Sequence, residues 1–145
     1  MVIAIIGESC VGKSTLAEEL NKKLCGEIIT GKDYLRLAKS ESTAAAMFRE
    51  KLSQALTGSH IIYVISEKEH LAFLPEGAIR ILVTADLETI KERFKARMRG
   101  NLPAAVEAML EKKHGLFDDI KCDLLYVSDR DDLDNICNEV AGLLS

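Results

Sequence analysis

Residues 7–14, Gly-Glu-Ser-Cys-Val-Gly-Lys-Ser, match the pattern GxxxxGK[ST] at every fixed position. Glycines in such a loop allow backbone N–H groups to turn inward around a phosphate. The amine of Lys13 would then reach the β- and γ-phosphates of a nucleotide, and the hydroxyl of Ser14 would lie on Mg²⁺. Thr15 is placed to bond an oxygen of the α-phosphate. The pattern therefore predicts a site for a nucleoside triphosphate, ATP, with Mg²⁺.

The sequence on either side of this loop supports the prediction. An apolar run ends directly before it and a segment of helical spacing starts directly after it, so a helix N-terminus adds its partial positive charge. The alternative is a glycine-rich turn with an incidental Lys-Ser pair. The residues expected at the nucleotide are Gly7, Glu8, Ser9, Cys10, Val11, Gly12, Lys13, Ser14 and Thr15.

A second candidate is the basic segment from Lys91 to Arg99, which has five cations against one acid. Arg93 and Arg97 are four residues apart, so they share one face of a helix. Guanidinium groups suit the negative charge that is spread over phosphoryl oxygens. The alternative is a solvated cationic face close to the C-terminus of its own helix, where positive charge is favourable.

The third candidate is the loop from Thr30 to Arg36. Asp33 would lie beyond the carboxyl end of a strand, which is where ligands of open α/β sheets bind. The alternative is that Asp33 caps a helix starting at Tyr34 and that Arg36 lies on the surface.

Short apolar runs alternate along the chain with segments of helical spacing. This alternation predicts an α/β fold of three layers, a parallel sheet with helices on both faces. The five expected strands are 2–6, 27–30, 61–65, 79–83 and 122–127. The expected helices run from 14 to the stop at Gly26, 43–56, 87–99, 103–115 and 131–144. Because no linker or repeat interrupts the pattern, residues 1–145 are expected to form one domain.

Composition excludes several classes of protein. A net charge of −4 over 145 residues argues against a nucleic-acid partner, and the longest apolar runs have only the length of strands, so no membrane partner is expected. The four cysteines form no CxxC pair. With no signal peptide at the N-terminus, they indicate reduced thiols in a cytoplasmic protein.

Taken together, these features resemble the P-loop nucleoside and nucleotide kinase family, with cytidylate-kinase-like members the nearest. The resemblance covers the loop 7–14, the segment Ile29–Asp33, the stretch Ala78–Met98, and the last strand and helix. It implies a five-stranded parallel sheet in the order 2-3-1-4-5, with a short lid around residues 99–104. It also implies phosphoryl transfer from ATP to a small acceptor, a CMP-like nucleoside monophosphate or a nucleoside.

The resemblance further implies roles for individual residues. Lys13, Arg93 and Arg97 would be catalytic, the two arginines by clamping the transferring phosphoryl group or by stacking on adenine. Asp33 would accept the proton of the acceptor hydroxyl, and Arg36 would hold a phosphate or carboxylate of the acceptor. Many P-loop kinases have an acid at or just after the third strand that orders Mg²⁺ or activates the acceptor, and this chain departs from that pattern. Glu67 would take the place of this acid, or Ser66 would hold a water there; the alternative is that Glu67 is only a charge of the loop.

A different class of function stays open. The third strand ends Val64-Ile65-Ser66-Glu67, with no Asp, and the lid is short. Both features favour a nucleotide-binding protein without phosphotransfer, either a switch or a degenerate kinase. A GTPase is disfavoured because the sequence has no DxxG or NKxD motif after a strand.

Overall fold

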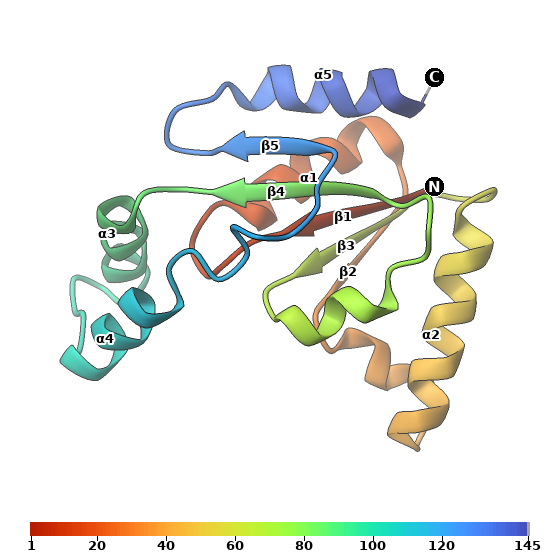
Figure 1. The fold of residues 1–145 in the computed structure, drawn as a ribbon, viewed down its shortest axis with the longest axis horizontal. Coiled ribbons are helices and arrows are strands. Elements are labelled where there is room, and N and C mark those ends of the chain that lie inside the picture. Colours follow the sequence, from red (N-terminus) through yellow and green to blue (C-terminus); the bar gives the residue numbers. More distant parts are fainter. Residues whose placement is uncertain (145) are drawn as a thin grey trace.

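The fold is a single five-stranded sheet with helices on both sides, seen in a computed structural model that describes residues 1–144 (Figure 1). Every strand pairing is parallel, and the strand order is β2-β3-β1-β4-β5. The strands are β1 (Val2–Ile6), β2 (Glu27–Thr30), β3 (Ile61–Ile65), β4 (Ile79–Thr84) and β5 (Leu124–Val127). The α-helices are α1 (Lys13–Leu24), α2 (Glu41–Ala55), α3 (Leu87–Arg97), α4 (Ala104–Lys113) and α5 (Leu133–Leu144), and η1 (Asp33–Leu37) and η2 (Lys68–Phe73) are 3-10 helices.

The buried strands come from the most apolar runs of the sequence. All five residues of β1 and all five of β3 are buried, as expected for strands that lie inside a sheet covered on both faces. The edge strands β2 and β5 keep part of their side chains in solvent. The predicted fold class and the predicted strand order are therefore both confirmed.

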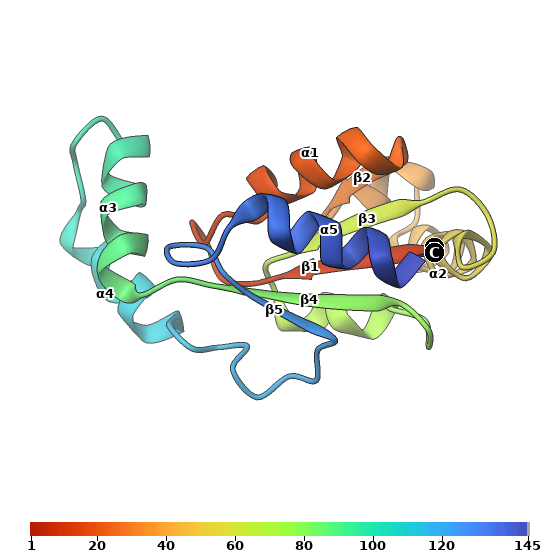
Figure 2. The same cartoon turned by 90° about the horizontal axis from the view of Figure 1, so that it is seen from above.

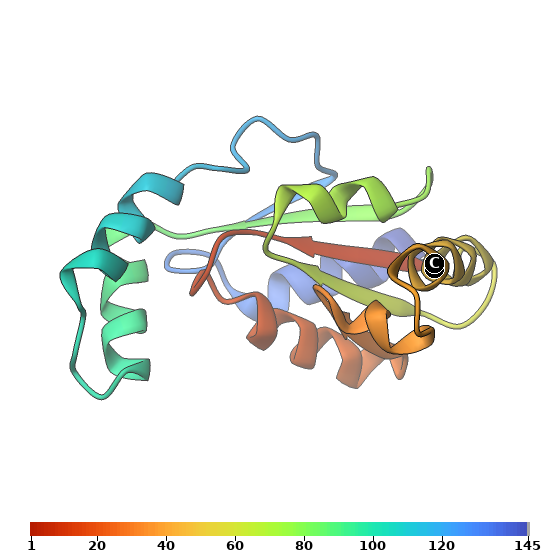
Figure 3. The ribbon, with the colours of Figure 1, turned by 90° about the horizontal axis from the view of Figure 1, so that it is seen from below.

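Two apolar cores lie on opposite faces of the sheet. Helices α1 and α5 pack on one face through Leu16, Leu20 and Val140. Helix α2 and the two 3-10 helices pack on the other, where Phe48 and Phe73 lie. Figures 2 and 3 show α1 and the yellow-green η2 on opposite sides of the strands.

The element boundaries agree with the sequence prediction except at a few ends. Ser40 caps α2 by accepting from the backbone N–H of Thr43 at 3.3 Å, so α2 begins two residues before the predicted start at residue 43. Asp86 is the N-cap of α3 and accepts from the N–H of Thr89 at 2.8 Å, in agreement with the predicted helix start at residue 87. The last strand begins at Leu124 rather than at residue 122, and α5 begins at Leu133 rather than at 131.

Helices α3 and α4 extend beyond the carboxyl ends of the strands, at the left of Figure 1. The amine of Lys91 joins them by pairing with Glu107 at 3.3 Å and with Glu111 at 2.7 Å. Residues 99–104 include the exposed turn between the two helices, where Arg99 and Gly100 both have positive φ. Among residues 1–144, no helix has the length and apolar character needed to cross a membrane.

Candidate nucleotide site

The loop between β1 and α1 has the backbone conformation that the glycine pattern predicts. Gly12, the N-cap of α1, has φ 105°, and Cys10 has φ 64°. A Cβ at Gly7 would lie 2.5 Å from the carbonyl oxygen of Val83, so only glycine fits there. The N–H of Gly7 donates to the carbonyl of Ile65 at 3.1 Å, which ties the loop to the end of β3. The positive φ values at residues 10 and 12 make the loop a cradle of the kind that binds phosphate.

Lys13 is buried at the first turn of α1. Its side chain folds back over the loop, and Nζ donates to the carbonyl oxygen of Glu8 at 2.6 Å. Burial lowers the pKa of Lys13 to about 8, although Cys10 and Glu8 act to raise it. The positive charge of Arg97 also lowers the pKa of Lys13, so this guanidinium acts on the same loop. The hydroxyl-bearing residues Ser14 and Thr15 are exposed beside it.

Arg93 connects the loop to the segment that follows β5. Its Nη1 donates to the carbonyl of Cys10 at 3.2 Å and to Oγ of Ser128 at 2.9 Å. The Ser128 hydroxyl in turn donates to the carbonyl of Val11. Two backbone carbonyls of the loop are thus held from one side. The arrangement stiffens the cradle before any ligand binds.

The carboxylate of Glu8 holds the loop from the other side. Oε2 of Glu8 accepts from the N–H of Gly115 at 2.9 Å, and Oε1 lies 2.6 Å from Nδ1 of His114. A cavity of about 370 Å³ lies next to these groups, with walls that include Gly7, Glu8, Thr84 and His114. The cavity adjoins the first residues of the loop, and the turn after α4 forms part of its wall.

Replacing Glu8 by Ala is expected to destabilise the protein by about 1–3 kcal/mol, because a partly buried N–H and an imidazole lose a charged acceptor. Urea unfolding measures this change. Glu19→Ala is the matched control, since Glu19 pairs only with the exposed Lys22 and should change stability by less than about 0.5 kcal/mol. Equal changes in the free energy of unfolding for the two substitutions would show that the Glu8 contacts do not stabilise the protein.

The residues expected to bind the acceptor are Asp33 and Arg36, and both lie in η1. Asp33 accepts through Oδ2 from the N–H of Thr30 at 3.1 Å, so it closes its own loop. Asp33 and Arg36 line a cavity of about 230 Å³ along β2, and no residue of the loop 7–14 lines that cavity. Between Asp33 and the end of β3, the hydroxyl of Tyr63 donates to the carbonyl of Gly31 at 2.8 Å, and burial raises the pKa of Tyr63.

Glu67 is exposed and follows β3, the strand next to β1. Its pKa is lowered, first by a hydrogen bond with the carboxyl of Glu69 and then by the positive charges of Lys32, His70 and Lys113. Lys32, after β2, and Lys113, at the end of α4, are thus within electrostatic range of Glu67.

The residues of the loop suit Mg·ATP. Inward-turning amides and an ammonium suit the phosphates, and the exposed hydroxyl of Ser14 is a hard oxygen ligand of the kind that Mg²⁺ prefers. Sequence reasoning did not find the contacts of Glu8, because His114 lies 106 residues away along the chain. The only local signal there is Gly115, which has φ 80°.

Comparison with known proteins agrees with this geometry. A family model described as "AAA domain" matches residues 3–108. No curated protein matches the chain in sequence.

Several solved structures share the fold. An uncharacterized protein from Eubacterium ventriosum is 16% identical with a TM-score of 0.70, over 99% of this chain and 97% of that chain. A shikimate kinase from Acinetobacter baumannii, in complex with shikimate, is 13% identical with a TM-score of 0.63, over 99% and 92%. A deoxyadenosine kinase from M. mycoides is 19% identical with a TM-score of 0.58, over 99% and 98%. The chain thus shares the fold of P-loop small-molecule kinases.

Proposed function

Because the chain belongs to the AAA domain family, whose model matches residues 3–108, we propose that it transfers a phosphoryl group from Mg·ATP to a small-molecule acceptor. One observation carries the proposal. The amine of Lys13 lies buried over the phosphate-binding loop, and the charge of Arg97 on α3 contributes to lowering its pKa, so a second cation lies within electrostatic range of the loop. A loop built only to hold a nucleotide needs the first cation, whereas stabilising a transferring phosphoryl group calls for the second.

In this proposal the amides of residues 7–12 and the amine of Lys13 hold the β- and γ-phosphates. When phosphate arrives, Lys13 exchanges the carbonyl of Glu8 for phosphoryl oxygens. Ser14 would hold Mg²⁺, which neutralises phosphate charge when it is bound. Arg93, held by Cys10 and Ser128, keeps the loop in place, and adenine would stack on its guanidinium.

Acceptor binding is assigned to the region around the ends of β2, β3 and α4. The notable charged groups there are Asp33, Glu67, Lys32 and Lys113. Asp33 would take the hydroxyl proton after leaving the N–H of Thr30, and Arg36 would hold an anionic group of the acceptor. A nucleoside monophosphate, CMP-like, or a nucleoside is the acceptor we propose. The deoxyadenosine kinase among the similar structures, solved with the products dCMP and dCDP, supports a nucleotide.

The proposed unit of function is one domain over residues 1–145, with residues 99–104 as the tip of a lid. Helices α3 and α4 are joined to each other by the ion pairs of Lys91, so they would move with this tip. Closure would bring Arg97 nearer to the phosphates and exclude water from them.

A second candidate is nucleotide binding without transfer. The observation that favours it is that both acids of the acceptor region already have partners. Asp33 is bonded to its own loop, and Glu67 is bonded to Glu69. A protein of this kind would bind ATP tightly and release no product.

The deciding experiment measures ADP release from Mg·ATP with a panel of nucleoside monophosphates, nucleosides and small hydroxy acids. Stimulation of at least about tenfold by one acceptor class is expected, and Lys13→Met serves as the blank. Arg36→Met is expected to raise the KM for that acceptor without changing the KM for ATP. ATP binding with no stimulation by any acceptor would favour the second candidate.

A further inference from the structure

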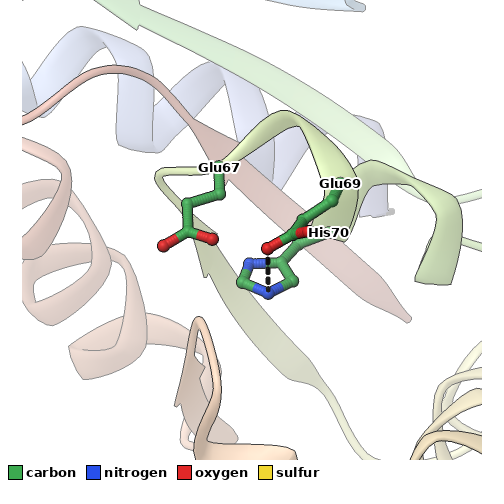
Figure 4. Close-up of side chains that lie close together, drawn as sticks. All are labelled: Glu67, Glu69 and His70. Atoms are coloured by element: carbon green, nitrogen blue, oxygen red, sulfur yellow. Dashed lines mark ion pairs between the residues drawn. The ribbon is translucent and has the colours of Figure 1, made fainter.

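Three potential metal ligands converge where β3 ends and η2 begins. Glu67, Glu69 and His70 each offer one ligand atom, and these atoms lie within 4.8 Å of one another. Figure 4 shows the two carboxylates on the same side of the imidazole. This cluster lies outside the loop that binds phosphate, and it needs no nucleotide to form.

The imidazole of His70 is buried and held rigidly. Only 4% of His70 is exposed, and its ring packs against Tyr34, Tyr63 and Phe73 at centroid distances of 6.2, 6.4 and 6.1 Å. Nδ1 is buried and has no hydrogen-bond partner among residues 1–144. In Figure 4 the dashed ion pair of 3.9 Å joins Nε2 to Glu69, and the other ring nitrogen lies on the side facing Glu67. A buried nitrogen without a partner is uncommon in native proteins, and it points to an absent ligand.

The carboxyl groups of Glu67 and Glu69 lie close together at the surface, with their potential ligand atoms within 4.8 Å of each other. Glu67 and Glu69 interact directly, and both side chains are exposed. A cation between the two carboxyl groups would replace the hydrogen bond between them, and the exposed side chain of Lys32 is free to move away from it.

We propose that Glu67, Glu69 and His70 form a site for a divalent transition-metal ion of the Mn²⁺ or Zn²⁺ class. Two carboxylates and one imidazole suit such borderline ions, whereas Mg²⁺ prefers oxygen ligands alone. Bonds of about 2.1 Å place two ligands of one ion no more than about 4.2 Å apart. The exposed glutamates close the remaining gap by small rotations, while His70 stays fixed.

Three protein ligands leave coordination positions open beside the ends of β2 and α4, where Lys32 and Lys113 lie. The titration below uses no nucleotide and no acceptor, so its failure is distinguishable from a failure of the proposed phosphotransfer.

Titration of the full chain with Mn²⁺ alone, without nucleotide, tests the site. The signal of free Mn²⁺ in electron paramagnetic resonance gives stoichiometry and affinity, and Mn²⁺ binds weakly to the free cysteines. One ion per chain is expected, and Zn²⁺ should displace it. His70→Phe keeps the ring shape in the aromatic cluster and removes both nitrogens, so affinity should fall at least about tenfold.

Two further variants distinguish the loss of a metal ligand from misfolding and from a general change in surface charge. Glu69→Gln changes an exposed side chain and should also weaken Mn²⁺ binding at least about tenfold. Glu76→Gln makes the same change at an exposed acid outside the cluster and should leave the affinity unchanged, as should Lys13→Met. Full Mn²⁺ affinity in folded His70→Phe or Glu69→Gln, or no bound Mn²⁺ in the wild type at millimolar metal, would overturn the proposal.

Discussion

Replacing Lys13 by Met is expected to lower ATP affinity by at least about 100-fold while making the free protein more stable. The loss follows because the only buried cation in residues 1–144 at the phosphate-binding loop disappears. The gain follows because burial lowers the pKa of Lys13 to about 8, so keeping its charge at pH 7 costs on the order of 3 kcal/mol. Loss of the hydrogen bond from Lys13 Nζ to the carbonyl of Glu8 offsets part of this gain in stability, which leaves a net stabilisation of about 1–2 kcal/mol.

Calorimetric titration with Mg·ATP and urea unfolding without nucleotide measure the two effects. Lys22→Met is the matched control, because Lys22 is exposed on the same helix and should change neither quantity by much. A variant that keeps its ATP affinity would contradict the assignment of the loop.

The lowered pKa of Lys13 also predicts how the wild type responds to pH. Between pH 8 and about 10.5 the unfolded chain holds a proton that the folded chain has released, so the stability of the free protein should rise with pH. Over the same range ATP affinity should fall, because the phosphates need the charged amine. Lys13→Met should lack the contribution of this residue to both slopes, so the difference between wild type and variant separates the effect of Lys13 from that of other titrating groups.

Replacing Arg97 by Ala is expected to lower kcat by about 100- to 1,000-fold while changing the KM for ATP only a few-fold. Arg97 is exposed at the end of α3, yet its charge acts on Lys13. Charge on the phosphoryl oxygens develops during transfer, so a guanidinium brought in by closure of α3 and α4 stabilises the transition state more than bound ATP.

Lys95→Ala is the matched control for this prediction. Lys95 is an exposed cation on the same helix, two residues away and hence on another face. Lys95→Ala tests whether any positive charge on α3 is enough to support kcat. Equal losses of kcat and ATP affinity in Arg97→Ala would identify Arg97 as a ground-state contact instead.

Local sequence signals were sufficient for most of the fold. The continuous apolar runs at Val2–Ile6 and Ile61–Ile65 are the strands buried on both faces, because only such strands lack polar positions. The end of α2 near Gly58 and the cap at Asp86 also follow from local chemistry. The role of Asp33 is ambiguous from local sequence alone, because an Asp at this position is compatible both with a helix cap and with a catalytic acid. In the structure it closes its loop onto Thr30, ahead of the short η1.

The sequence by itself determined the parallel α/β fold and the position of the phosphate-binding loop, because both depend on neighbouring residues and on the period of apolar side chains. Only the tertiary structure decided what surrounds that loop. The contacts of Glu8 with His114 and of Arg93 with Ser128 join residues 106 and 35 positions apart. The burial that lowers the pKa of Lys13 likewise arises only when distant segments pack together, and no local pattern encodes such contacts.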